Sequence, residues 1–414
     1  MNDATTAEAP RHPIAEADTR VAMLAMFAIL LASYVINAMD RQIFPLLAAD
    51  VRKEYGFSLA DTGLLSTIFT LGMAVAGWPT GYLLARYSRK SVLQIGIAIF
   101  SVGTVLTAFA GGMADMLVYR AATGIGEAMQ LTALIAVATS YFVRYRAAAV
   151  GAINASFGVG AIIGPIAAAV LLSAQGTWRG PIIGFGLIGF VAMAVIWVAV
   201  RPSLTEVVHR QQGRVLAGGA ASLRNRNTIL LTVLSLIGGL IIYGYLGMYP
   251  TFLREQLHYS PADTGSVMSI YGLGVLASLV GGWLGDRFSP RLVLGFAFLA
   301  AAALGHFIFQ GATAFAGQAC LSFIWGFVVS GTIYVNLAGY HVKSVAPDQA
   351  GRATGVFVTA LYGAGAFAGY LIGFIANKAG WVSAGLIQIS CLAIVGALLS
   401  LALNPKEMSS SRSG

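Results

Sequence analysis

An acidic and a basic side chain, Asp40 and Arg41, stand side by side within an apolar stretch long enough to cross a membrane. Apolar sequence runs through residues 21–36 and resumes at 43–47. An ionised side chain at membrane depth costs roughly 2.5–3.5 kcal/mol on insertion scales, so such residues face a polar interior and mark a functional site. We expect Asp40 to carry a proton and Arg41 to meet a substrate anion, with Asn37 as a further binding residue. The alternative is that the two charges neutralise each other at a helix end.

A second pair of charges, Arg120 and Glu127, lies in another apolar stretch. The two residues are seven apart, which places them two turns apart on nearly the same helix face. Gly124 and Gly126 lie between them and allow another helix or a ligand to come close. Glu127 has no charged neighbour in its Ala/Gly/Thr-rich surroundings, so we predict that Asp40 and Glu127 couple transport to protons and that Arg120 binds substrate. The alternative is a structural pair that ties this helix to the first one.

Aromatic and amide side chains in the second half of the chain are the other candidate site residues. The predicted cavity-lining residues there are Tyr243, Tyr334, Asn336 and Tyr362. Tyr249 and Tyr340 are interpreted instead as members of the aromatic belt at a membrane surface. We interpret His306 as a packing residue and His341 as a surface residue.

Composition identifies the class of protein that must position these residues. The 414 residues are 57% hydrophobic and only 10% charged, against about 25% charged in soluble domains, and the mean hydropathy is +0.78. The apolar runs are continuous and lack the alternation of barrel strands, which predicts an all-α polytopic membrane protein. A net charge of +9 does not indicate nucleic acid here, because Lys and Arg gather in loops on one side.

Several other functions lack the residues that they would need. There is no Gly-x-x-x-x-Gly-Lys-Ser/Thr loop for a nucleotide, no His/Cys/carboxylate cluster with metal spacing, and no pair of nucleophile and base. The two cysteines, Cys320 and Cys391, lie in apolar segments and predict no disulfide. The first twenty residues lack the pattern of a removable signal peptide. We therefore expect no cofactor and no enzymatic activity.

A membrane span needs about 20 mainly apolar residues, and this length predicts twelve spans. Their approximate limits are 21–46, 58–84, 91–111, 114–140, 147–173, 181–200, 228–253, 261–285, 291–311, 313–342, 352–376 and 381–403. The predicted organisation is a tail (1–20), a first six-helix bundle (21–200), a linker (201–227), a second six-helix bundle (228–403) and a second tail (404–414). The loops rich in Lys and Arg, including the linker, are predicted to be cytoplasmic together with both termini, in an inner (plasma) membrane of bacterial type.

The two halves repeat each other. Asp61-Thr-Gly63 opens the second span and Asp263-Thr-Gly265 opens the eighth, and each of these spans ends in a glycine-containing basic turn, at 81–90 and 282–291. Two parallel copies of a six-span unit, with a substrate site between them at mid-membrane, are a known plan of secondary transporters.

The two basic turns resemble the loop motif of the major facilitator superfamily, Gly-x-Leu-x-Asp-Arg-x-x-Arg-Arg/Lys. The resemblance implies that superfamily's fold of twelve helices in two halves, and a conformational latch formed by Gly81, Arg86, Arg89, Asp286 and Arg287. Ala85 stands where the first copy of the motif would have Asp. Asp40-Arg41-Gln-Ile, Asp61-Thr-Gly-Leu-Leu and Arg120-x-x-Thr-Gly-Ile-Gly-Glu127 resemble spinster-type members and anion:cation symporters. In those families the matching acids take part in proton coupling.

The four charges of the first half predict the substrate. Asp40 and Glu127 balance Arg41 and Arg120, so protonation of either acid leaves the cavity positive and favours binding of an organic anion. We therefore expect a proton-coupled transporter of a small carboxylate such as a sugar acid, an aromatic acid or a short organic acid. We expect it to work by alternating access, as a monomer surrounded by lipid. The alternatives are a spinster-like, proton-driven exporter of lysolipids or other amphipathic molecules and, from another class, a membrane sensor or intramembrane enzyme.

Overall fold

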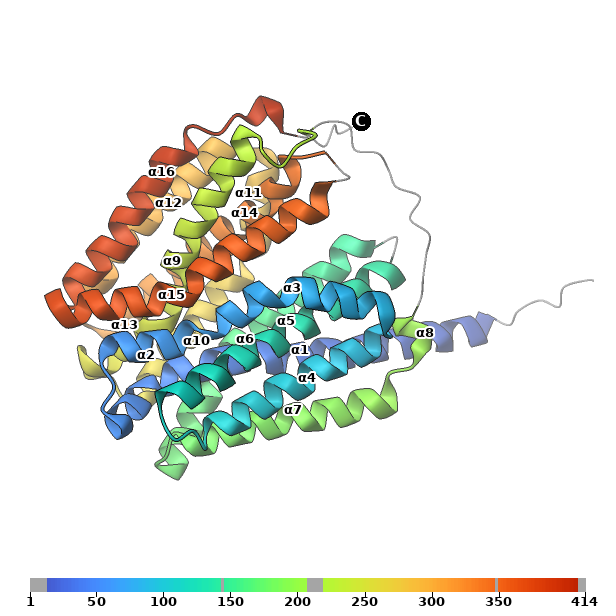
Figure 1. Cartoon of the computed structure of the whole chain (residues 1–414), viewed down its shortest axis with the longest axis horizontal. Coiled ribbons are helices and arrows are strands. Elements are labelled where there is room, and N and C mark those ends of the chain that lie inside the picture. Colours follow the sequence, from blue (N-terminus) through green and yellow to red (C-terminus); the bar gives the residue numbers. More distant parts are fainter. Residues whose placement is uncertain (1–12, 143–144, 207–218, 347–348, 409–414) are drawn as a thin grey trace, which may run out of the picture.

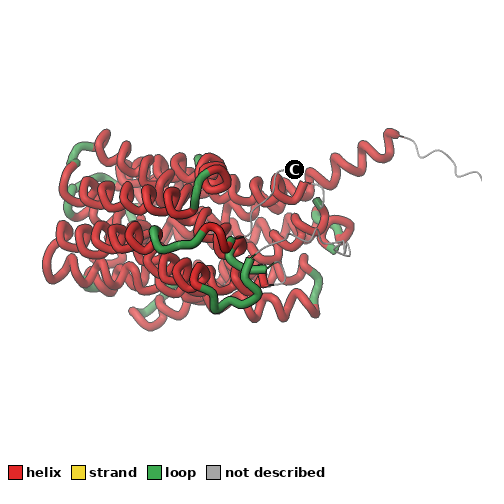
Figure 2. The backbone as a smooth tube through the Cα atoms, turned by 90° about the horizontal axis from the view of Figure 1, so that it is seen from above, coloured by secondary structure: helices red, strands yellow, loops and turns green. Residues whose placement is uncertain are grey.

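The computed structural model describes residues 13–142, 145–206, 219–346 and 349–408, and within these ranges it contains helices and loops but no β-strand (Figures 1 and 2). The helices of the first half and the linker are α1 (Pro13–Tyr55), α2 (Leu59–Thr67), α3 (Phe69–Arg86), α4 (Arg89–Thr107), α5 (Met113–Tyr141), α6 (Arg146–Gln175), α7 (Arg179–Ala199) and α8 (Pro202–Thr205). Those of the second half are α9 (Arg226–Glu255), α10 (Pro261–Leu276), α11 (Ser278–Arg287), α12 (Pro290–His306), η2 (Phe307–Gly311), α13 (Phe315–Trp325), η3 (Gly326–Tyr334), α14 (Val335–Lys343), α15 (Ala350–Ala384), η5 (Gly385–Cys391), α16 (Leu392–Ser400) and η6 (Pro405–Glu407).

These helices form twelve membrane spans, as the sequence predicted. Eleven helical stretches of the described chain are long and apolar enough to cross a membrane, and the last of them, Ala350–Ser400, has 51 residues. A continuous helix of that length would extend about 77 Å, against a hydrocarbon core of about 30 Å. Gly380, with φ at +83°, breaks this stretch. The stretch therefore holds the eleventh and twelfth spans.

The sequence repeat corresponds to a structural repeat at the start of the second span in each half. Ser58 caps α2 by accepting a hydrogen bond from the backbone N–H of Asp61, at 3.1 Å. Ser260 caps α10 through Asp263 in the same way, also at 3.1 Å. Side chains that accept from the first turn satisfy N–H groups that have no partner within the helix. The repeated Asp-Thr-Gly triplets are thus the first turns of equivalent helices.

The two halves meet at one end of the molecule and spread apart at the other (Figure 1). We call the end where α1 and α9 finish the far end, and the end that carries α8 the linker end. Toward the far end α2 packs directly on α15, and a Cβ at Gly63 would lie 1.9 Å from the carbonyl oxygen of Gly369. Thr67 adds a hydrogen bond across the same contact, to the carbonyl of Ala366 at 2.8 Å. Small residues therefore let the backbones of the two halves touch.

Two ion pairs join the ends of α1 and α9 at the far end. Arg52 contacts both carboxylate oxygens of Glu255 at 2.9 Å, and Arg254 binds both oxygens of Asp50. The partners are more than 200 residues apart in sequence. None of these four residues was a candidate site residue from the sequence. These far-end ion pairs hold the two halves together on the side where they are closed.

Reversal of one charge in the far-end ion pairs is expected to open the far end more often. In Asp50→Arg, the new cation faces Arg254. Partly exposed ion pairs contribute roughly 0.2–1 kcal/mol each, so we expect a several-fold rise in far-end opening. Ser66 is buried beside Arg41, toward the far end. The measurement is the rate at which a Ser66→Cys thiol reacts with a reagent added from that side, with Cys320 and Cys391 replaced by Ser.

The doubly reversed variant Asp50→Arg/Arg254→Asp restores opposite charges and serves as the control. We expect its labelling rate to return toward that of the parent protein. Equal rates in the single variant and the parent would show that these pairs do not hold the far end closed.

Candidate functional site

Arg41 of α1 and Glu127 of α5 form a buried ion pair at the centre of the molecule. Arg41 Nε lies 3.0 Å from Glu127 Oε2, and the two side chains are 6% and 0% exposed. The Nη2 atom of Arg41 and both carboxylate oxygens of Glu127 have no hydrogen-bond partner among the described residues. The charge of the Glu127 carboxylate is therefore compensated by Arg41, whereas the Nη2 group of Arg41 still has donors with which to bind a second anion.

Asp40 and Arg120 lie beside this pair and have other partners. Asp40 accepts a hydrogen bond from the Thr104 hydroxyl of α4, at 2.9 and 3.0 Å to its two oxygens. The Arg120 guanidinium lies over the rings of Phe44 and Phe69, 4.6 and 5.3 Å from their centroids. Adjacent helix residues point about 100° apart, so Asp40 and Arg41 face different neighbours. The structure thus argues against the alternative that Asp40 and Arg41 neutralise each other, and it gives Glu127, which has no charged neighbour in its own helix, a partner from α1.

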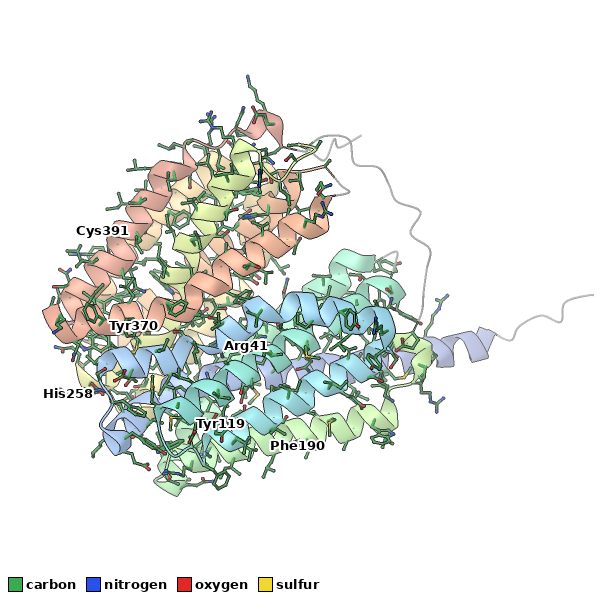
Figure 3. The ribbon with its side chains drawn as sticks, in the orientation of Figure 1. Arg41, Tyr119, Phe190, His258, Tyr370 and Cys391 are labelled. Carbon is green, nitrogen blue, oxygen red and sulfur yellow. The ribbon has the colours of Figure 1, made fainter. Side chains whose placement is uncertain are left out.

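A cavity of about 180 Å³ lies between the two halves, with Arg41 on its wall. Figure 3 labels Arg41 near the middle of the bundle, where the halves face each other. The described residues that line the cavity are Tyr34, Arg41, Leu131, Ile135, Asn154, Phe157, Ile242, Tyr243, Leu246, Tyr271, Val275, Ser278, Ser330, Tyr334, Val335 and Tyr362. The cavity thus combines one arginine with six aromatic rings and a few hydroxyl and amide groups.

The lining residues indicate that the cavity extends from Arg41 toward the linker end. Asn154 lies two turns from the start of α6, and Ser278 begins α11, which ends in the turn at the linker end. On the other side of Arg41 only a space of about 20 Å³ remains, next to Ser66, Phe69 and Gly247. The site is therefore closed toward the far end.

The predicted cavity residues fall into two groups. Tyr243, Tyr334 and Tyr362 line the cavity, and the hydroxyl groups of Tyr334 and Tyr362 lie 3.1 Å apart. Asn37 donates to Gln130 Oε1 at 2.8 Å and joins α1 to α5. Asn336 donates to the carbonyls of Gly281 and Thr332 at 2.8 and 2.9 Å. The two amides serve helix packing, which argues against a role in substrate contact, and Arg120 is likewise absent from the cavity wall.

Three of the six aromatic residues of the wall, Tyr34, Phe157 and Tyr271, were not expected from the sequence. Tyr34 precedes Arg41 by seven residues, and this spacing alone places the two on one helix face. The ring centroid of Phe157 in α6 lies 5.7 Å from the guanidinium carbon of Arg41. The hydroxyl of Tyr271 is hydrogen-bonded to the hydroxyl of Ser330, at 2.7 Å. No charge or motif distinguishes these residues in the sequence. The role of Phe157 and Tyr271 is visible only once the halves are packed together.

Four further interpretations from the sequence were wrong. Tyr249 and Tyr340 are 0% and 1% exposed and do not belong to a surface belt; Tyr249 donates to Gln318 at 2.7 Å. His306 is exposed, whereas His341 is fully buried with Nδ1 2.8 Å from the carbonyl of Leu337. In each case, a span limit gave the depth of the residue but not the direction of its side chain.

Of the predicted latch residues, Asp286, Arg86 and Arg287 contact side chains of their own halves, and Arg89 contacts the linker. Asp286 pairs with Lys343 at 2.7 Å and so joins α11 to α14. Arg89 donates to the carbonyl of Thr205 in α8 at 3.2 Å. Arg86 and Arg287 stack on Tyr82 and Trp283, respectively, and a Cβ at Gly81 would meet no atom within 4 Å. A role for these residues in conformational change stays a prediction.

Two six-helix halves around a central cavity with a buried charge are the architecture of a membrane transporter. The sequence profile of the Major Facilitator Superfamily matches residues 30–370. The chain belongs to this superfamily, whose members are transporters and not enzymes.

Relatives of this chain have transporter names. A "Probable sulfoacetate transporter SauU" of Cupriavidus necator is 26% identical, and the match covers 92% of this chain and 93% of the relative. The "4-hydroxybenzoate transporter PcaK" of Pseudomonas putida is 24% identical, with 94% of both chains covered. A "Probable L-galactonate transporter" of Escherichia coli K12 is 24% identical over 67% of this chain, and the match spans 65% of that relative's length.

Among solved structures, the chain is similar to a bacterial homologue of the human lysosomal transporter spinster in an inward-facing, occupied conformation. The TM-score is 0.75 at 16% identity, and the match covers 93% of this chain and 98% of that one. At this level of identity the likeness concerns the fold.

Proposed function

We propose that this protein is a proton-coupled transporter that carries a small organic carboxylate by alternating access. The observation that carries the proposal is the Arg41 guanidinium on the cavity wall, which is paired with Glu127 and has one terminal nitrogen without a hydrogen-bond partner among the described residues. A planar guanidinium presents donors that match a carboxylate. Arg41 is the one lysine or arginine among the lining residues, so it is the residue to which an anion would bind.

Coupling follows from the charge balance around Arg41. Asp40 and Glu127 offset Arg41 and Arg120 when all four are ionised, so a bound anion would leave one negative charge in excess. An uncompensated buried charge costs about 3–5 kcal/mol. A proton on Glu127 removes that excess and releases Arg41 from its internal partner. The substrate and the proton would therefore bind together and move in the same direction.

The cavity wall favours a small and partly aromatic substrate. Six aromatic side chains line the cavity together with Arg41, and rings stack well on flat apolar groups. A volume of about 180 Å³ lies below the roughly 300–1,000 Å³ typical of pockets for drug-sized ligands. This size argues against a lysolipid, which needs space for a long chain. The names of the relatives suggest three candidate substrates of suitable size, namely sulfoacetate, 4-hydroxybenzoate and L-galactonate.

The test is uptake into proteoliposomes of these three labelled acids and a labelled lysolipid, with and without a proton gradient. We expect accumulation of at least one of the acids, with 4-hydroxybenzoate ahead of L-galactonate, and only when the outside is acidic. Transport of the lysolipid with exclusion of all three acids would favour the spinster-like alternative. Accumulation of an acid without any effect of the proton gradient would contradict the coupling.

We also propose that the linker end is cytoplasmic in a bacterial inner membrane. Basic turns such as Arg86–Lys90 and Arg287–Arg291 lie at this end, and positive residues are retained in the cytoplasm. Thr177 and Tyr87 are exposed at opposite ends of the first half. In a background with both native cysteines replaced, we expect an impermeant thiol reagent added to cells to label Thr177→Cys but not Tyr87→Cys. Labelling of both from outside would contradict this orientation.

A further inference from the structure

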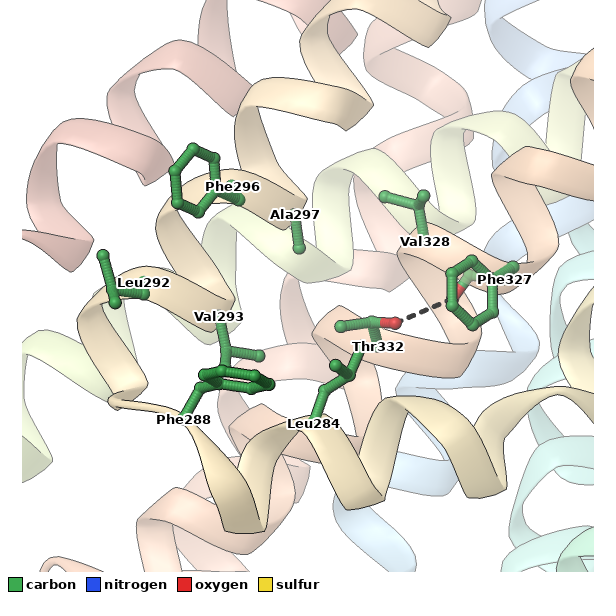
Figure 4. A pocket seen from close by; sticks show the side chains of 9 residues that line it. All are labelled: Leu284, Phe288, Leu292, Val293, Phe296, Ala297, Phe327, Val328 and Thr332. Carbon is green, nitrogen blue, oxygen red and sulfur yellow. Dashed lines mark hydrogen bonds between the residues drawn. The ribbon is translucent and has the colours of Figure 1, made fainter.

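The outer face of the second half has an apolar groove that the transport cavity does not use. Its volume is about 460 Å³, and it lies between α11, α12 and η3 (Figure 4). The residues that line it are Leu284, Phe288, Leu292, Val293, Phe296, Ala297, Phe327, Val328 and Thr332. The Thr332 hydroxyl donates to the carbonyl of Phe327, so the polar atom in this wall has its partner. The groove therefore presents an apolar surface to the membrane.

A second apolar groove, of about 170 Å³, lies on the other side of α12, against α16. Leu292 and Phe296 line both grooves and are 50% and 68% exposed. They are one helical turn apart and form a ridge between the grooves. From Arg291 to Leu299, the lining of the second groove follows α12 for about 12 Å. This length corresponds to much of one leaflet, since the whole hydrocarbon core is about 30 Å thick.

Cationic side chains lie where both grooves reach the linker end. Arg291 lines the second groove and donates through Nε to the carbonyl of Leu403. Arg287 precedes the groove residue Phe288 and stacks on Trp283, 5.4 Å from the ring centroid. The nearby Asp286 is paired with Lys343, at 2.7 Å, and Glu407 accepts a hydrogen bond from the Asn404 amide, at 2.7 Å. Because Asp286 is neutralised by Lys343, the two arginines outnumber Glu407 and leave the rim of the grooves with a net positive charge.

We infer that one anionic phospholipid with two acyl chains binds across α12. Its chains lie in the two grooves, on either side of the ridge formed by Leu292 and Phe296, and its headgroup lies at Arg287 and Arg291. Two apolar channels separated by a single ridge match the two chains of one lipid. A guanidinium pair at the level of the headgroups selects a phosphate that carries net negative charge over a zwitterionic one. This site is separate from the transport cavity and does not depend on the proposed substrate.

The test uses native mass spectrometry of the full-length protein in detergent with added phosphatidylglycerol or phosphatidylcholine. We expect the parent protein to retain one phosphatidylglycerol at concentrations where phosphatidylcholine is lost. Arg287→Gln/Arg291→Gln should lower the ratio of the two lipids about tenfold or more, because two charge-assisted contacts are removed. Gly295→Leu should reduce retention of both lipids, since a Cβ at Gly295 meets no atom within 4 Å and the new side chain occupies the second groove.

Two control variants separate the site from general effects. Gly184→Leu places the same side chain at a position of α7 that is equally open, and Arg224→Gln removes an exposed cation from the linker. Neither should change lipid retention. Equal retention of the two phospholipids by the parent protein would overturn the role of the arginines. Unchanged retention in Gly295→Leu, or a loss of the same size in Gly184→Leu, would overturn the location of the chains.

Discussion

Substrate binding is expected to fall by ten- to a hundredfold or more in Arg41→Ala. Loss of a charge-assisted hydrogen bond costs about 1.5–3 kcal/mol. The same change leaves Glu127 without its partner, 3.0 Å away in the parent protein. The measurement is the Kd for the transported acid in the purified protein. Arg41→Lys should recover only part of the affinity, because an ammonium group is a point charge without the guanidinium fork.

Arg120→Lys is the matched control for Arg41→Lys. Both substitutions keep the charge, and both parent side chains are buried. Only Arg41 lines the cavity, whereas Arg120 stacks on Phe44 and Phe69. We therefore expect the lysine at position 41 to weaken binding far more than the lysine at position 120. The opposite order would make Arg120 the anion site and would contradict the proposed geometry.

Glu127→Gln is expected to separate exchange of the substrate from its accumulation. Glutamine resembles the protonated acid, so Arg41 stays available and the substrate should still bind and exchange between the two sides of a membrane. A side chain that cannot release a proton cannot use the proton gradient, so accumulation against a substrate gradient should fall to background. The measurements are counterflow and proton-driven uptake in the same proteoliposomes. Loss of both activities would indicate that Glu127 has a structural role instead.

Asp40→Asn provides the comparison for Glu127→Gln. Asp40 is bound by the Thr104 hydroxyl on α4, and it is not among the residues of the cavity wall. We expect Asp40→Asn to reduce the rate of transport and to retain some proton-driven accumulation. Full accumulation in both Asp40→Asn and Glu127→Gln would show that neither acid couples transport to protons.

Much of the fold could be predicted from local sequence. Twenty-residue apolar runs define the spans, and the repeated Asp-Thr-Gly triplets that begin at Asp61 and Asp263 define equivalent helices in the two halves. The two charged stretches around Arg41 and Glu127 do come together, because a buried charge requires a partner. Each of these features depends on a continuous stretch of sequence or on the general cost of burying a charge.

The pairing of charges could not be predicted in this way. Arg41 selects Glu127 over its neighbour Asp40 because of the direction in which each side chain leaves α1. The far-end pairs Arg52–Glu255 and Asp50–Arg254 depend on how one half packs on the other. Tyr249 and Tyr340 likewise have the composition of belt residues, but neighbouring helices cover them completely. Such contacts arise from tertiary packing, which residue type and spacing do not specify.

Proton uptake on substrate binding tests the central claim most directly. Purified protein in a weakly buffered solution is mixed with the transported acid, and the change in pH is recorded at several starting pH values. If the substrate replaces Glu127 on Arg41, the parent protein should take up about one proton per bound anion in the pH range where Glu127 is ionised. Glu127→Gln should bind the acid without proton uptake. Binding without uptake in the parent protein at every pH, or equal uptake in Glu127→Gln, would contradict the proposed coupling.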